Sequence, residues 1–162
     1  MLLNNYLPWY AVLLCILIIG GVQDWRTGEV SNWISIPLFL MGAIAVIVRM
    51  LFADALFALS IFAMIAITLA AFKGWLGGAD WKILIGLFGL WPLAGFAALV
   101  VAGVWGALAA LWNRDRNARF PGVSAFAFAA CLTFFAQVSI ILLNEVCASR
   151  LRRLHECNAA RE

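Results

Sequence analysis

Long apolar runs alternate with short polar stretches along the whole chain. No charged residue precedes Asp24, and none occurs between Lys82 and Arg114. A transmembrane helix needs about 20 predominantly apolar residues, so the pattern predicts an all-α, polytopic membrane bundle with six transmembrane helices. We expect the spans at about residues 7–22, 32–48, 55–72, 77–91, 92–111 and 123–143.

The fourth span is predicted to be short. The uncharged run from Ile83 to Asn113 is too long for one span, but it is shorter than the roughly 40 residues that two full spans need. The Trp91-Pro92 step divides this run, because the residue before a proline disfavours the helical conformation. The piece after Pro92 has full length, so Asp80 should lie in or near the first turn of the short helix before it.

Composition supports a membrane protein and excludes several other classes. Hydrophobic residues make up 66% of the chain and charged residues 12%, whereas an average soluble domain has about 25% charged residues. The net charge of +3 is small and scattered, which argues against a nucleic-acid partner. The single His excludes a polyhistidine metal site, and we expect no metal and no other cofactor. The first apolar run lacks a basic start, so we expect it to be a retained span rather than a cleaved signal peptide.

Neither a repeat nor a linker divides the chain, so residues 1–148 are expected to form one membrane domain, followed by a basic tail at 149–162. Lysine and arginine favour cytoplasmic loops. With the N-terminus outside, the inner loops hold Arg26, Lys73, Lys82, Arg114, Arg116 and Arg119. We therefore predict a multi-pass protein of the cytoplasmic membrane with its N-terminus outside, although the arginines of the tail oppose this orientation.

The stretch Gly77-Gly78-Ala79-Asp80-Trp81-Lys82 places an acid inside an apolar chain. A carboxylate at the centre of a membrane helix costs about 2.5–3.5 kcal/mol on insertion scales. Gly77 has no side chain and Ala79 has a small one, so another group can approach Asp80 closely. Lys82 points to another side of the helix. Asp80 is thus a candidate functional acid; the alternative is an ordinary carboxylate at a helix start near the water interface.

A second acid, Asp24, ends the first span on the same predicted face. Packed helix axes lie about 8–10 Å apart, so the carboxyl groups of Asp24 and Asp80 can converge. Two such groups share a proton, because both cannot ionise at close range without a large energetic cost. One then activates water as a base, and the other donates a hydrogen bond, as in an aspartic protease. A proton-coupled transporter also uses such acids, so the pair alone leaves both functions open.

The residues around the two acids carry a family resemblance. The segment from Asp24 to Asn32, DWRTGEVSN, resembles the D-x-R-x-x-x-[IV]-P-N signature of type IV prepilin peptidases, and GGADWK from Gly77 resembles their G-x-G-D-x-K signature. Two positions depart from these patterns: Ser31 replaces the usual proline and Ala79 the second glycine.

The resemblance implies that Asp24 and Asp80 are the catalytic pair of an aspartic endopeptidase. Its substrate would be a prepilin-like or preflagellin-like protein with a short basic leader, a glycine at the cleavage site and an apolar helix, cut at the cytoplasmic membrane face. The family's cysteine-rich zinc region is missing here, so we expect no methyltransferase activity. The compact chain is similar to the peptidases of tight-adherence pili and of archaeal flagella.

Three alternatives remain from the sequence: an intramembrane aspartic protease with another helical substrate, a proton-coupled transporter, and a non-enzymatic scaffold. A transporter would be expected to show inverted repeats, which we do not find, and a scaffold needs neither acid.

Eight neighbours of the acids are predicted to bind substrate or to support the site: Trp25, Arg26, Asn32, Gly77, Gly78, Ala79, Trp81 and Lys82. Several also have simpler interpretations. Both tryptophans can anchor the protein at the membrane interface. Arg26 can be a positive charge that favours the cytoplasmic side. Lys82 can extend its ammonium group to the interface, and Asn32 can cap the second helix.

The predicted orientation can be tested by cysteine labelling. In a cysteine-free background, an impermeant thiol reagent should label Thr27→Cys and Asn117→Cys only after it is admitted to the cytoplasmic side. Ser60→Cys, within the third span, should resist the reagent from both sides. Labelling of the first two positions from outside would reverse the orientation.

Overall fold

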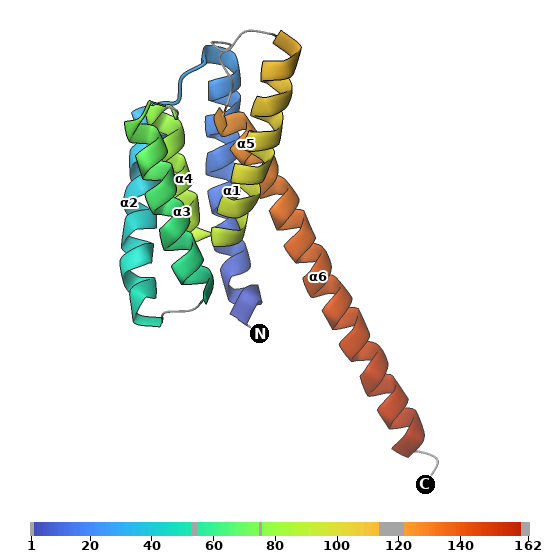
Figure 1. The fold of residues 1–162 in the computed structure, drawn as a ribbon. Coiled ribbons are helices and arrows are strands. Elements are labelled where there is room, and N and C mark those ends of the chain that lie inside the picture. Colours follow the sequence, from blue (N-terminus) through green and yellow to red (C-terminus); the bar gives the residue numbers. More distant parts are fainter. Residues whose placement is uncertain (1, 53–54, 75, 114–121, 160–162) are drawn as a thin grey trace.

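The computed structural model describes residues 2–52, 55–74, 76–113 and 122–159, and these ranges form an all-α bundle (Figure 1). The elements in chain order are α1 (Leu2–Thr27), α2 (Asn32–Arg49), a 3₁₀ turn (Met50–Phe52), α3 (Ala55–Phe72), α4 (Gly78–Leu90), α5 (Pro92–Asn113) and α6 (Gly122–Ala159). The six predicted helices are therefore confirmed. The predicted inner-loop residues Arg114, Arg116 and Arg119 lie outside the described residues.

The first helix extends further than the sequence pattern predicted. The first span was expected to end at about residue 22, but α1 continues to Thr27. The Thr27 hydroxyl donates to the Gln23 carbonyl at 2.9 Å, and the Gly28 N–H donates to the Asp24 carbonyl at 2.8 Å. The chain turns only at Gly28, whose φ of 68° is a conformation that glycine adopts readily. Asp24 is consequently held on a helix instead of a loop.

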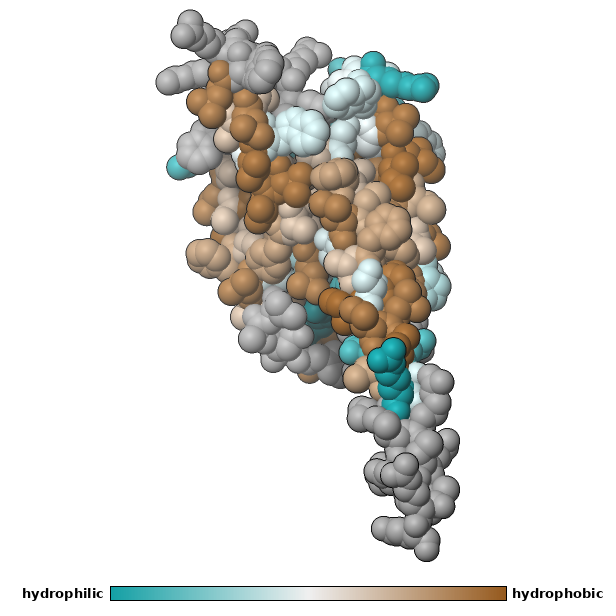
Figure 2. Space-filling view, turned by 90° about the vertical axis from the view of Figure 1, so that its right-hand side faces the viewer, coloured by the Kyte–Doolittle hydropathy of each residue, from teal (hydrophilic) through white to brown (hydrophobic). Residues whose placement is uncertain are grey.

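Four of the helices are long and apolar enough to cross a membrane: residues Leu7–Thr27, Asn32–Arg49, Pro92–Ala109 and Gly122–Arg150. A shorter apolar segment, Phe57–Phe72, occupies most of α3. The helix α4 has only 13 residues, about 20 Å at 1.5 Å per residue, as the sequence predicted. In Figure 2 hydrophobic side chains cover most of the middle of the face in view, as expected for a membrane protein.

The short helix α4 forms the centre of the bundle. All its side chains from Ile83 to Gly89 are buried, and Leu84, Leu87 and Phe88 are among the most deeply buried of the core. It packs against α2, α3, α5 and α6. At its far end the ring of Trp91 stacks on Tyr10 of α1, with centroids 4.5 Å apart. A helix too short to span a bilayer alone is thus enclosed by longer ones.

Small residues bring α2 and α4 into close contact. Gly42 of α2 faces Gly86 and Gly89 of α4, with their backbones in contact. A β-carbon added to Gly86 would lie 2.7 Å from the carbonyl oxygen of Leu38. Nothing in the sequence pattern indicates that Gly42 lies against these two glycines of α4.

The last helix is much longer than the others and leaves the bundle. Near its start it packs against α1 and α5, and most side chains from Gly122 to Ala130 are buried. Beyond Cys131 most of the described side chains are exposed, and the helix diverges from the bundle (Figure 1). It continues as one helix through part of the predicted basic tail, as far as Ala159.

The α2–α4 contact predicts opposite effects for two glycine substitutions. Gly86→Ala should destabilise the protein by about 1–3 kcal/mol, because the new methyl group forces the helices apart. Gly103→Ala in α5 is the control: nothing lies within 4 Å of its added β-carbon, and alanine favours a helix over glycine by about 1 kcal/mol. Thermal unfolding in detergent measures both. Equal stability of the two variants would contradict a tight α2–α4 contact.

Candidate active site

Asp24 lies in the last helical turns of α1 and is only 8% exposed. Its Oδ2 atom accepts hydrogen bonds from two backbone N–H groups at the start of α6, those of Val123 at 3.0 Å and Ser124 at 3.3 Å. The first N–H groups of a helix have no partner within the helix, and its N-terminus carries a partial positive charge. The carboxylate of one helix therefore caps another helix about 100 residues later.

The hydroxyl of Ser124 strengthens this contact. It donates a hydrogen bond to the Gly21 carbonyl of α1 at 2.8 Å, one helical turn before Asp24. Close approach is possible because Gly21 has no side chain: a β-carbon there would lie 3.0 Å from that of Ala127. The start of α6 is thus attached to α1 at two neighbouring points.

Asp80 lies in the first turn of α4, as predicted, and is partly buried. Its carboxyl group rests against the backbone of Gly122, the first residue of α6. A β-carbon on Gly122 would be 2.7 Å from Asp80 Oδ1 and 3.0 Å from Oδ2. Gly77, the residue that precedes α4, borders the other side, since its added β-carbon would lie 3.0 Å from Oδ2. Two glycines therefore make room for this one carboxyl group.

The two predicted acids meet at the first turn of α6. Asp24 contacts Val123 and Ser124, Asp80 contacts Gly122, and the charges of the two carboxyl groups interact. The sequence predicted that the acids converge but not that the first turn of α6 contacts both of them. The one signal was the Pro121-Gly122 pair at the start of the last span, which indicates a helix start but not its partner.

Trp81 and Lys82 support the site from the side of α2 and α3. The indole Nε1 of Trp81 donates to Thr68 Oγ1 of α3 at 3.1 Å, and its ring packs on Phe39. Lys82 Nζ donates to Asn32 Oδ1 at 3.3 Å. Ser31 and Asn32 were both candidates for the cap of α2, and the structure selects Ser31, whose side chain accepts from the Trp33 N–H. Both contacts fix the start of α4, where Asp80 lies.

The remaining predicted neighbours are placed more loosely around the acids. Trp25 and Arg26 are exposed on α1, with Trp25 67% exposed. An added β-carbon on Gly78 would meet nothing within 4 Å, and Ala79 is partly buried in the first turn of α4. Trp25 and Arg26 therefore face outward beside Asp24, and Gly78 leaves open space near Asp80.

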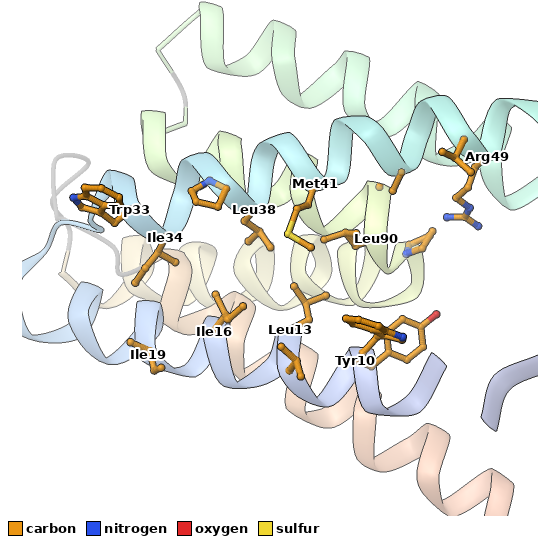
Figure 3. A pocket seen from close by; sticks show the side chains of 17 residues that line it. Tyr10, Leu13, Ile16, Ile19, Trp33, Ile34, Leu38, Met41, Arg49 and Leu90 are labelled. Atoms are coloured by element: carbon orange, nitrogen blue, oxygen red, sulfur yellow. The ribbon is translucent and has the colours of Figure 1, made fainter. Parts of the chain in front are cut away.

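Two grooves lie on either side of α1. One, of about 460 Å³, lies between α1 and α6 and reaches the backbone that holds Asp24. Its lining includes Gly21, Ser124, Ala127, Phe128, Trp25 and Arg26. The other, of about 810 Å³, lies between α1 and α2 (Figure 3) and is lined mainly by apolar side chains such as Leu13, Ile16, Leu38 and Met41. Neither acid lines either groove, but Ser124, whose N–H donates to Asp24, borders the smaller one, which is therefore the groove next to the candidate site.

A search for metal ligands among the described residues finds no group of three or more His, Cys, Asp or Glu side chains able to hold an ion. The site consists of two carboxyl groups, backbone N–H donors and small residues.

An all-α membrane bundle in which two acids meet at a helix start belongs to the class of polytopic proteins with a buried carboxyl pair. Comparison with protein families identifies the chain more closely. It belongs to the type IV leader peptidase family, whose model matches residues 11–144. This match includes Asp24, Asp80 and the first turn of α6. Searches of curated proteins and of solved structures found no match. The predicted family resemblance is confirmed, and the chain is a membrane protein of a peptidase family.

The capping bonds predict that Asp24 affects stability through its oxygen rather than its charge. Asp24→Ala leaves the N–H groups of Val123 and Ser124 without their acceptor, and we expect a loss of about 1–3 kcal/mol. Asp24→Asn keeps an acceptor oxygen and removes a buried charge, so its stability should stay level or rise. Thermal unfolding in detergent compares the two. If Asp24→Ala unfolds at the same temperature as Asp24→Asn, these hydrogen bonds contribute nothing to stability.

Proposed function

We propose that the protein is a membrane-embedded aspartic endopeptidase that removes the short leader of type IV prepilin-like or preflagellin-like proteins at the cytoplasmic membrane face. Asp24 and Asp80 form the catalytic pair. The observation that carries this proposal is the meeting of the two carboxyl groups at one helix start, inside a chain of the leader peptidase family.

In the proposed reaction the two carboxyl groups share one proton. The ionised group takes a proton from a water molecule as the oxygen of that water attacks the carbonyl carbon of the scissile peptide bond. The protonated group donates to the carbonyl oxygen, which gains negative charge in the transition state. Collapse of the tetrahedral intermediate breaks the C–N bond, and the leaving nitrogen takes a proton from the pair. Water is the only co-reactant.

The groove between α1 and α6 supports a substrate with an apolar helix. Its exposed side chains include Val22 and Phe128, and its end near Asp24 is bordered by Ser124. A substrate helix embedded in the same bilayer reaches this groove from the lipid without passing through the bundle. The peptide bond before that helix then lies near the water interface, where the acids are proposed to act.

The central test is replacement of each acid by its amide. Asp24→Asn and Asp80→Asn keep the size of the side chains but cannot share a proton, so either should reduce leader cleavage by at least about 10²–10⁴-fold. The double variant should cleave the leader only slightly more slowly than either single variant, because the pair acts as a unit. The measurement is conversion of a prepilin-like substrate to its mature form in liposomes.

Glu145→Gln is the matched control, since Glu145 is an exposed acid in the part of α6 that leaves the bundle. It should cleave at close to the normal rate. Near-normal processing by Asp80→Asn would refute the aspartic mechanism. Proton-linked transport in liposomes would then be the next measurement, since a transporter is the alternative use of these acids.

A further inference from the structure

We propose that the first turn of α6, Gly122-Val123-Ser124, positions both carboxyl groups for the reaction, so that these three residues are a positioning element of the active site. The inference rests on the proposed function and adds residues that neither acid motif contains. It follows from four contacts: one made by Gly122, one by Val123 and two by Ser124.

Val123 and Ser124 fix the rotation of the Asp24 carboxyl group. Both of their backbone N–H groups donate to the same oxygen, Oδ2. An aspartate with one oxygen held at 3.0 Å and 3.3 Å by a rigid helix start cannot turn freely about its side-chain bonds. Oδ1 is then the oxygen that faces the reacting water. Reacting groups must be held near the productive geometry, and a misplacement of about 1 Å can cost about 10²-fold in rate.

Gly122 sets how closely the Asp80 carboxyl group approaches α6. Its α-carbon forms one wall of the space that this group occupies, because a β-carbon there would lie 2.7 Å from Oδ1 and 2.9 Å from the carboxyl carbon. Real side-chain contacts are not this short, so any other residue would push Asp80 away from Asp24 or move α6. Glycine at this position therefore lets the Asp80 carboxyl group lie directly against the backbone of α6.

Ser124 connects these two effects to α1. Its hydroxyl holds the Gly21 carbonyl at 2.8 Å while its N–H holds Asp24 Oδ2. A shift of the α6 start relative to α1 would stretch both bonds. The distance between the acids thus depends on one helical turn that touches the helix carrying Asp24 and the side chain of Asp80.

The first experiment removes a single N–H group. Proline is tolerated in the first turn of a helix but has no N–H, so Val123→Pro deletes the 3.0 Å bond to Asp24 and keeps the helix. We expect kcat for leader cleavage to fall on the order of 10²-fold, with KM changed by no more than a few-fold. Two controls are needed, because Val123 is also a core side chain that is only 1% exposed. Val123→Ala removes most of this side chain but keeps the N–H group, so it should keep more kcat than Val123→Pro. Leu93→Pro tests the effect of proline itself. Leu93 is also the second residue of its helix, α5, and is exposed, so this variant should keep its kcat.

The second experiment is a cycle on stability that needs no activity. Gly122→Ala should lower the unfolding temperature of the otherwise unchanged protein, although alanine normally favours a helix. In an Asp80→Ala background the carboxyl group is gone, the added β-carbon has room, and the same change should no longer be destabilising.

A third experiment measures activity. Gly122→Ala alone should reduce kcat. Ser124→Thr, which keeps the hydroxyl and the N–H, should retain more activity than Ser124→Ala.

The outcomes separate this inference from the proposed function. If the acid-to-amide variants are inactive but Val123→Pro and Gly122→Ala both keep their kcat, the pair is catalytic and the positioning role is wrong. If Gly122→Ala destabilises the otherwise unchanged protein and the Asp80→Ala variant equally, Gly122 does not determine the position of Asp80, and the inference is again wrong. A wild-type protein that cleaves no leader would contradict the proposed function, while the stability cycle would still decide whether Gly122 seats Asp80.

Discussion

A buried carboxylate that caps a distant helix is the interaction on which the arrangement of this protein depends. Asp24 is 8% exposed in an apolar bundle, where an unpaired charge would be very unfavourable. The first N–H groups of α6 would also be unfavourable without an acceptor, although less so than the charge. The Asp24 carboxylate and these N–H groups are hydrogen-bonded to each other, although about 100 residues of sequence separate them. This mutual dependence determines where α6 begins, against which turn of α1 it packs, and hence what surrounds the second acid.

The two acids come from different halves of the bundle. The helices α2 and α3 pack on α4, which carries Asp80, and α1, which carries Asp24, packs on α6, while α5 packs on both α4 and α6. The glycine contact between α2 and α4 and the bonds of Trp81 and Lys82 fix the first half near Asp80. The second half is fixed by the contacts of Ser124. The candidate site lies where the halves meet, so its geometry depends on the packing of both.

Much of this architecture was predictable from the sequence, because the signals involved are local. Apolar runs and the Trp91-Pro92 step predict the helices and the short α4, and the motifs around Asp24 and Asp80 predict the family. Contacts between distant segments were not predictable in this way. Nothing in the local sequence pairs Gly42 with Gly86, or Gly122 with Asp80, because close backbone contact leaves no periodic pattern. The choice between Ser31 and Asn32 as the cap of α2 was open for a related reason: both are good caps, and only the structure shows that Ser31 caps the helix while Asn32 accepts from Lys82.

The position of α6 in the sequence has a consequence for biosynthesis. Ribosomes make α1 before α6, so while the nascent chain lacks α6, Asp24 lacks the N–H groups that hold it in the folded bundle. The surroundings of the two acids are complete only once α6 has docked. A chain interrupted after α5 would therefore contain both acids without these surroundings. Such a fragment would present an uncapped Asp24 carboxylate and would not be a smaller version of the folded protein.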